Sequence, residues 1–252
     1  QRPPSQHQTA ILPSEKSLRN RPEGQRPCLI IGRSCPWAHR TWLVYQIRNL
    51  NQNIKLLIAQ ANHQTGRWEL DPPWLNCDSL HQLYQRSGKP PSHRATVPCL
   101  IDPGPKKNQI PQLLGNESAQ LVEVLNQWPT NDDAPNLYPE KLQNEIMEWQ
   151  NLLQNTVNNG VYRCGFARSQ FAYDHASKEL FETLEKVNKS LSEKGPWLCG
   201  EELTLADIRL FPTLVRWEMV YMPLFGCSQK PLWAFSNLWR WRKNLFSQPN
   251  VA

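Results

Sequence analysis

The chain has 252 residues, of which 39% are apolar and 20% charged, with 11 tryptophans; this composition excludes a disordered chain and indicates a globular protein with its own core. The net charge of +6 comes from scattered basic side chains without the aromatic and basic motif of a nucleic-acid-binding module, so we expect no nucleic-acid partner. No apolar run approaches the roughly 18 residues of a membrane span, and the N-terminal residues lack the apolar centre of a signal peptide, so we expect no membrane span and a cytoplasmic protein.

The first part of the chain predicts a βαβ unit behind a leader. Residues 1–26 are rich in Pro, Gln and Arg without a helical or strand period, and predict a flexible leader. A buried strand is expected at 28–32, a helix at 36–50 with Pro36 in its first turn, and a second strand at 54–60. A βαβ unit favours parallel strands joined by a right-handed crossover.

A second unit of two strands and a helix follows after a polar connection that contains prolines. The strands are expected near 96–102 and 109–114, and the sequence "NESAQLVEVLNQW" predicts a helix. Together the two units predict an α/β domain over residues 27–128. Residues 129–138, a cluster of Pro, Asn and Asp without period, predict a linker.

Residues 139–252 predict an all-helical domain. Apolar residues recur at three- and four-residue spacing in four segments, which are 139–160, 173–195, 203–221 and 234–246. A glycine at the end of each of the first two segments is expected to end its helix.

The third of these segments carries a helix-start signal and a proline. Thr204 and Asp207 stand three residues apart, as in a capping box, so Asp207 is interpreted as structural rather than catalytic. Pro212, within the same segment, predicts a kink.

The seven cysteines form no CxxC pair and no Cys/His cluster with zinc spacing, so we expect neither disulfides nor a metal. Cys35 differs from the others because it directly precedes the first turn of a predicted helix, where unpaired N–H groups and the helix dipole favour thiolate. We therefore expect its pKa to lie below that of an ordinary thiol. From position alone, a buried thiol at a strand end stays the alternative.

The neighbourhood of Cys35 indicates chemistry with a small external thiol. Ala38 occupies the position at which a dithiol oxidoreductase carries its second cysteine, so a mixed disulfide at Cys35 needs an external thiol such as glutathione. In "TVPCL", a cis bond between Val97 and Pro98 would leave backbone free to pair with an extended peptide.

The sequence "NES" offers groups for the other end of such a peptide. Glu117 and Ser118 stand where a helix begins, and their carboxylate and hydroxyl can hold an ammonium and a carboxylate of a γ-glutamyl group. Alone, "NES" is equally explained as a helix cap. Together with the cysteine and the Val-Pro pair, it forms a candidate glutathione site.

These segments resemble a known family. The sequences "CPWAHRT", "TVPCL", "NESAQ", "TVNNGVYRCGFARSQFAYDHA" and "LTLADIRLFPTLVRW" are similar to those of the glutathionyl-hydroquinone reductases, the xi class of glutathione transferases, related to the omega class. The resemblance runs from about residue 28 to the C-terminus. It implies the glutathione transferase fold, with a thioredoxin-like α/β N-terminal domain and an all-α C-terminal domain.

The resemblance also implies a reaction and its residues. The Cys35 thiolate attacks the glutathione sulfur of a glutathionylated hydroquinone, and a second glutathione, the co-substrate, reduces the mixed disulfide; no metal is required. The residues implied to bind glutathione are Trp68, Arg94, Val97, Pro98, Glu117 and Ser118. Tyr162 and Tyr221 are implied at the aromatic-substrate side, where the alternative interpretation makes both of them helix-packing residues.

The chain departs from the family at three places and in length. Residues 32–40 are "GRSCPWAHR", where the family has "SLACPWAHR". Arg67 stands in place of a glycine, and Gly226 stands in place of a lysine. The chain also resembles a short form without the usual C-terminal extension. The resemblance implies a homodimer to which that extension contributes.

Two other functions stay open from the sequence. An omega-like deglutathionylase or dehydroascorbate reductase would use the same Cys35. A non-catalytic protein that binds an aromatic ligand would have no need of a thiol at a helix start.

Overall fold

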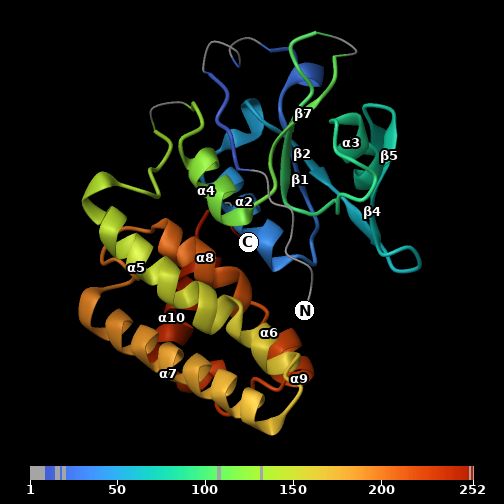
Figure 1. Ribbon diagram of the computed structural model, residues 1–252. Coiled ribbons are helices and arrows are strands. Elements are labelled where there is room, and N and C mark those ends of the chain that lie inside the picture. Colours follow the sequence, from blue (N-terminus) through green and yellow to red (C-terminus); the bar gives the residue numbers. More distant parts are fainter. Residues whose placement is uncertain are drawn as a thin grey trace. The chain divides into compact units, whose positions relative to one another are not determined.

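The computed structural model describes residues 9–14, 18, 21–106, 109–130, 133–249 and 251 (Figure 1). The chain divides into two compact units, an N-terminal unit of residues Gln1–Pro135 and a C-terminal unit of residues Asn136–Ala252. The boundary falls within residues 129–138, for which the sequence predicts a linker.

A four-stranded sheet with the strand order β2-β1-β6-β7 forms the centre of the N-terminal unit. Its strands are β1 (Cys28–Ile31), β2 (Lys55–Ile58), β6 (Cys99–Asp102) and β7 (Gln112–Gly115). The predicted parallel pairing of β1 with β2 is confirmed, while β6 runs antiparallel to both β1 and β7. All four residues of β1 are buried, which agrees with its continuous apolar sequence.

Helices α2 (Pro36–Ile47) and α4 (Ser118–Asn126) pack against each other and against this sheet. Helix α2 contacts β1, α4 contacts β6, and Figure 1 shows the two helices side by side. Pro36 is the first residue of α2, as predicted. The helix ends three residues before the predicted position 50, because Asn49 adopts the left-handed conformation with φ 53°.

A second, three-stranded sheet occupies a segment for which the sequence predicts only a connection. Its strands are β3 (Gln60–Asn62), β4 (Arg67–Trp74) and β5 (Cys77–Ser79), in that order, and helix α3 (Leu80–Arg86) packs on β4 and β5. The prediction missed β4 because prolines 72 and 73 argue against a strand. They lie where the pairing register of β4 with β5 shifts, between Glu69 and Trp74, so the ladder is irregular there.

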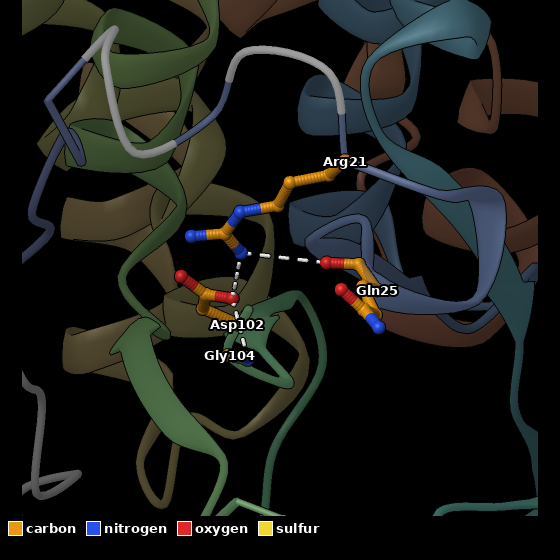
Figure 2. Close-up of polar contacts among 4 residues, drawn as sticks. All are labelled: Arg21, Gln25, Asp102 and Gly104. Carbon is orange, nitrogen blue, oxygen red and sulfur yellow. Dashed lines mark hydrogen bonds and ion pairs between the residues drawn. The ribbon is translucent and has the colours of Figure 1, made fainter. Parts of the chain in front are cut away.

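Part of the segment predicted as a flexible leader is attached to the N-terminal unit. The Ile11 N–H donates to the Leu114 carbonyl at 2.8 Å, which extends the hydrogen bonding of β7. The Arg21 guanidinium forms a buried ion pair with Asp102 at the end of β6 and donates to the Gln25 carbonyl at 3.4 Å (Figure 2). These contacts tie the described part of the leader to the sheet, whereas residues 1–8 of that segment lie outside the described residues.

The same ion pair is supported from the turn after β6. The Asp102 carboxylate also accepts the Gly104 N–H at 2.8 Å, and the side chains of Arg21 and Asp102 are only 6% and 11% exposed. A buried pair that loses one partner leaves an uncompensated charge, so Arg21 and Asp102 hold each other in place.

The described residues of the C-terminal unit form helices and one isolated β-bridge, between Trp197 and Gly200. The helices are α5 (Gln143–Leu153), α6 (Gly160–Gly165), α7 (Gln170–Lys194), α8 (Leu205–Leu214), α9 (Met222–Phe225) and α10 (Ser236–Phe246). Two π-helical segments, Gln154–Asn158 and Trp217–Tyr221, and two 3-10 turns, Glu140–Leu142 and Leu232–Ala234, complete the unit. None of the helices in the described part of the chain is long and apolar enough to cross a membrane.

Helix α8 is the centre of this unit, because all of its residues are buried. The predicted capping box is confirmed: the Asp207 carboxylate accepts the Thr204 N–H, and the Thr204 hydroxyl caps the first turn. Pro212 lies within α8, two residues before its end, and the kink that it predicts stays a prediction.

The ends of two predicted helices differ in the structure. Gly160, expected to end the first helix, is instead the first residue of α6 and continues the helical path after a π-helical segment. Gly195 follows α7 with φ 128°, as expected for a glycine that ends a helix. The predicted helix 203–221 is divided into α8 and the π-helical segment Trp217–Tyr221.

Candidate functional site

Cys35 lies at the start of α2, in the position that the sequence predicts. After β1, residues 32–35 form a tight turn in which the Cys35 N–H donates to the Gly32 carbonyl at 3.0 Å. The Cys35 carbonyl then accepts the His39 N–H at 3.0 Å, the first hydrogen bond of the helix. Cys35 is thus the N-cap residue, and its thiol lies near the positive end of the helix dipole.

The turn before β6 is brought next to this thiol. The Cys35 Sγ lies 3.6 Å from the Val97 carbonyl oxygen, within the distance of a hydrogen bond to sulfur. The peptide bond between Val97 and Pro98 is cis, and both residues are buried. The cysteine and the Val-Pro pair of the predicted site therefore lie together, although 62 positions separate Cys35 from Val97.

Trp68 packs against the strand end that leads to Cys35. It lies on β4, and a Cβ atom placed on Gly32 would come within 2.4 Å of its indole ring. A glycine is needed at position 32 because the ring occupies the space of a side chain. Trp68 thereby packs on Gly32, which stands three residues before Cys35 in the chain.

The "NES" segment begins α4, directly after β7. The Glu117 carboxylate accepts the Ala119 N–H at 3.2 Å, so Glu117 is the N-cap residue of α4. The Ser118 hydroxyl donates to the same carboxylate at 3.5 Å. This is the geometry of an ordinary helix cap, the alternative that the sequence left open for "NES". It also fixes a carboxylate and a hydroxyl at the N-terminus of a helix.

Arg94 is more exposed than the other residues that the sequence predicts for the glutathione site. It lies in the loop between α3 and β6, three residues before Val97. Its guanidinium can therefore meet a carboxylate of a ligand that arrives from solvent. Among the residues that the structure describes, no group of three or more His, Cys, Asp and Glu side chains could hold a metal ion.

The two predicted tyrosines meet within the C-terminal unit. The hydroxyls of Tyr162, on α6, and Tyr221, at the end of the second π-helical segment, lie 3.3 Å apart. Their rings form an edge contact with centroids 5.8 Å apart. Tyr221 is buried, whereas Tyr162 is half-buried, so the pair presents one hydroxyl-bearing ring toward the surface.

Two phenylalanines that the sequence analysis missed complete an aromatic cluster around these tyrosines. Phe225 contacts both tyrosine rings at centroid distances of 5.4 Å, and Phe166 stacks on Tyr162 at 6.4 Å. Phe166 is 69% exposed, which leaves an open aromatic face. The sequence feature that could have indicated this cluster is Gly165. A Cβ atom there would lie 2.5 Å from the Phe225 ring, so the close packing requires a glycine.

Cys35 is the one cysteine of the seven that is not buried. Burial raises the pKa of Cys99 and of Cys199 to about 12, and it also raises the pKa of Cys28 and Cys77. A hydrogen bond with Cys227 lowers the pKa of Cys164, but the Cys164 side chain is only 4% exposed. Reagents in solvent therefore meet one accessible thiol.

We expect iodoacetamide to modify Cys35 before any other cysteine. Because the helix start favours the thiolate, the alkylation rate at pH 6.5 should remain within about threefold of the rate at pH 8. An ordinary thiol with a pKa near 8.5 would slow about 20-fold over the same interval. Peptide mass spectrometry after limited reaction measures both the site and the rate. Alkylation that falls with pH as free cysteine does would contradict this expectation.

The two units together define a class of protein. A four-stranded α/β unit followed by an all-helical unit is the glutathione transferase fold, and the family model described as "Glutathione S-transferase, C-terminal domain" matches residues 170–244. The chain is 35% identical to the glutathionyl-hydroquinone reductase YqjG of Escherichia coli over 240 residues, which are 91% of this chain and 71% of the relative. It is also 35% identical to the glutathionyl-hydroquinone reductase PcpF of Sphingobium chlorophenolicum, over 92% of this chain and 75% of the relative.

Solved structures agree with these sequence relatives. The glutathione-bound structure of YqjG from Escherichia coli superimposes with a TM-score of 0.79 at 34% identity, and the match covers 90% of this chain and 75% of that one. The xi glutathione transferase of Phanerochaete chrysosporium gives a TM-score of 0.80 at 33% identity, over 91% of this chain and 81% of that one. The chain belongs to the glutathionyl-hydroquinone reductases, the xi class of glutathione transferases.

Proposed function

We propose that this protein removes glutathione from glutathionylated hydroquinones through Cys35. The observation that carries the proposal is the half-buried thiol at the start of α2, 3.6 Å from the Val97 carbonyl, in a chain whose other six cysteines are buried. A thiol held at a helix N-terminus next to a cis Val-Pro turn can meet an extended thiol peptide. The two curated relatives named above carry the name of this reaction.

The reaction takes two steps, in each of which a thiolate attacks the sulfur of a glutathionyl group. In the first, the Cys35 thiolate attacks the glutathione sulfur, and the bond between that sulfur and the aromatic carbon breaks. The electron pair leaves on the ring carbon, which takes a proton, so free hydroquinone departs and Cys35 keeps the glutathionyl group as a mixed disulfide. In the second, a glutathione thiolate attacks the glutathionyl sulfur of that disulfide, which frees Cys35 and yields glutathione disulfide.

The glutathionyl group is bound by residues of the N-terminal unit in this proposal. The backbone of Val97, in the cis pair with Pro98, hydrogen-bonds the extended peptide, and Trp68 flanks it. Glu117 and Ser118 bind its γ-glutamyl end, where a carboxylate faces the ammonium and the N-terminus of α4 faces the carboxylate. Arg94 adds positive charge for a glutathione carboxylate.

The hydroquinone is bound by the aromatic cluster of the C-terminal unit in this proposal. The half-buried Tyr162 can donate its hydroxyl to a phenolic oxygen of the substrate, and the buried Tyr221 hydroxyl, 3.3 Å away, holds the Tyr162 hydroxyl from behind. The exposed ring of Phe166 offers a face for stacking. A homodimer, which the family implies, stays a prediction that light scattering on the full chain tests.

The experiment that tests the function is a comparison of three substrates in the presence of glutathione. We expect rapid release of hydroquinone from a glutathionylated hydroquinone, with one glutathione disulfide formed for each hydroquinone released. Chromatography measures the first product, and a glutathione reductase assay measures the second. Faster turnover of dehydroascorbate or of a glutathionylated peptide would favour the omega-like alternative. Binding of glutathione without turnover of any of the three would favour a binding protein.

A further inference from the structure

Tyr84 lies behind the candidate glutathione site and touches both of the loops that form it. It is on α3, is 1% exposed, and its hydroxyl donates to the Thr96 carbonyl at 3.0 Å. The side chain of Asn116 lies beside the same hydroxyl, where it acts to lower the pKa of Tyr84. Thr96 directly precedes the cis Val-Pro pair, and Asn116 directly precedes Glu117. One buried hydroxyl thus connects the two segments to which we assign the two ends of glutathione recognition.

Other contacts of Tyr84 reach the same segments. Cys99, on the far side of the Val-Pro pair, lies near the tyrosine hydroxyl, and the ring of His93 lies 5.6 Å from the Tyr84 ring, centroid to centroid. His93 itself is buried, next to Arg94. Tyr84 therefore contacts the residues before and after the Val-Pro turn, as well as the loop that carries Arg94.

The hydroxyl of Tyr84 keeps its proton under all ordinary conditions. Burial, followed by the neighbouring Cys99, raises the pKa of Tyr84 well above its usual value of 10. A protonated hydroxyl donates to the Thr96 carbonyl, and its oxygen keeps lone pairs that face the Asn116 amide beside it. In a buried network of this kind, each bond is strengthened by the low local dielectric.

We infer that Tyr84 is a positioning residue for glutathione, which holds the Val97 backbone and the Glu117–Ser118 pair at the separation that the peptide requires. This inference rests on the proposed function. It follows because removal of the hydroxyl takes a hydrogen-bond donor from the Thr96 carbonyl and a polar neighbour from the Asn116 side chain, and either loop can then shift. Binding geometry that depends on two loops is sensitive to shifts of about 1 Å.

Tyr84→Phe tests this role, because it removes only the hydroxyl and keeps the buried ring. We expect the Kd for reduced glutathione, measured by calorimetry, and the KM for glutathione to rise about five- to twentyfold, while kcat changes by less than about twofold. Alkylation of Cys35 by iodoacetamide without glutathione should keep its rate within about twofold, because α2 rather than Tyr84 positions the thiol.

Tyr45→Phe is the matched control in the same unit. Tyr45 is also a buried helical tyrosine, and its hydroxyl donates to the Ile54 carbonyl at 3.2 Å, away from both loops of the site. A general loss of stability would affect both variants, whereas a positioning role affects only Tyr84→Phe. We expect Tyr45→Phe to keep the wild-type Kd for glutathione within about twofold.

Asn116→Ala removes the network from its other end and covers the case in which Tyr84→Phe folds poorly. It should weaken glutathione binding by a similar factor, and the double variant should lose less than the product of the two single losses, because both substitutions remove one shared interaction. An unchanged Kd in Tyr84→Phe, an equal loss in Tyr45→Phe, or fully multiplicative losses would overturn the positioning role alone. No binding of glutathione by the unsubstituted chain would overturn the proposed function instead.

Discussion

Cys35→Ser abolishes the release of hydroquinone, with kcat/KM reduced at least about a thousandfold. A serine hydroxyl is not ionised near neutral pH and cannot form the mixed disulfide on which the proposed reaction depends. Glutathione should still bind, with a Kd within about threefold of the wild-type value, because the substitution changes one atom and leaves α2 and its N-terminal N–H groups in place. Calorimetry with glutathione and the hydroquinone assay measure the two quantities separately.

Cys77→Ser is the matched control for this substitution. Cys77 is buried in the same unit, and its thiol lies 3.5 Å from the Leu75 carbonyl, to which a serine hydroxyl can donate in the same way. We expect this variant to keep its activity within about twofold. Retention of full turnover by Cys35→Ser would remove the covalent mechanism, and equal losses in both variants would indicate a general effect on folding.

Asp207→Ala lowers the free energy of unfolding of the C-terminal unit by about 3–5 kcal/mol. The buried carboxylate accepts four hydrogen bonds of 2.8–3.2 Å from two backbone N–H groups, one hydroxyl and one indole. The donors belong to Leu198, Thr204 and Trp241. Alanine leaves these groups buried without that acceptor and also removes half of the capping box of α8. Urea unfolding followed by tryptophan fluorescence measures the loss.

Two further variants identify the cause of this loss. Asp174→Ala removes an exposed aspartate of α7 that accepts only the Gln170 side chain at 2.8 Å, and should change stability by less than about 0.5 kcal/mol. Asp207→Asn keeps one of the two acceptor oxygens and should lie between alanine and the wild type. Where it folds, it should keep the normal alkylation rate of Cys35, because Asp207 acts in structure rather than in chemistry. A loss of less than about 1 kcal/mol in Asp207→Ala would contradict this account.

Several of the predictions that succeeded concern short-range features. The start of α2 at Pro36 follows from the fixed φ of proline and its missing N–H group. The capping box joins residues only three positions apart, and the apolar run of β1 agrees with a strand that is buried on both faces. In each case, the residues that determine the structure are close together in the chain.

The predictions that failed concern segments whose structure depends on distant partners. The strands β3 to β5 are short, and Pro72 and Pro73 in β4 argue against a strand until the irregular register of its pairing is known. The leader has no secondary-structure period, yet Arg21 is anchored because Asp102 lies at the end of β6. Gly160 carries an end signal but begins α6, so a glycine alone does not end a helix.

For the candidate site, the sequence by itself determined which groups are present and the local state of each: a thiol at a helix start, a Val-Pro turn, and a carboxylate with a hydroxyl at another helix start. Only the tertiary structure decided that Cys35 meets the Val97 carbonyl and that Trp68 fills the space over Gly32. It also decided that the hydroxyl of Tyr84 donates to the Thr96 carbonyl and lies beside Asn116. Helix caps and turns depend on residues that are close together in the chain. These contacts join residues far apart in the chain, so they depend on how the sheet and helices pack.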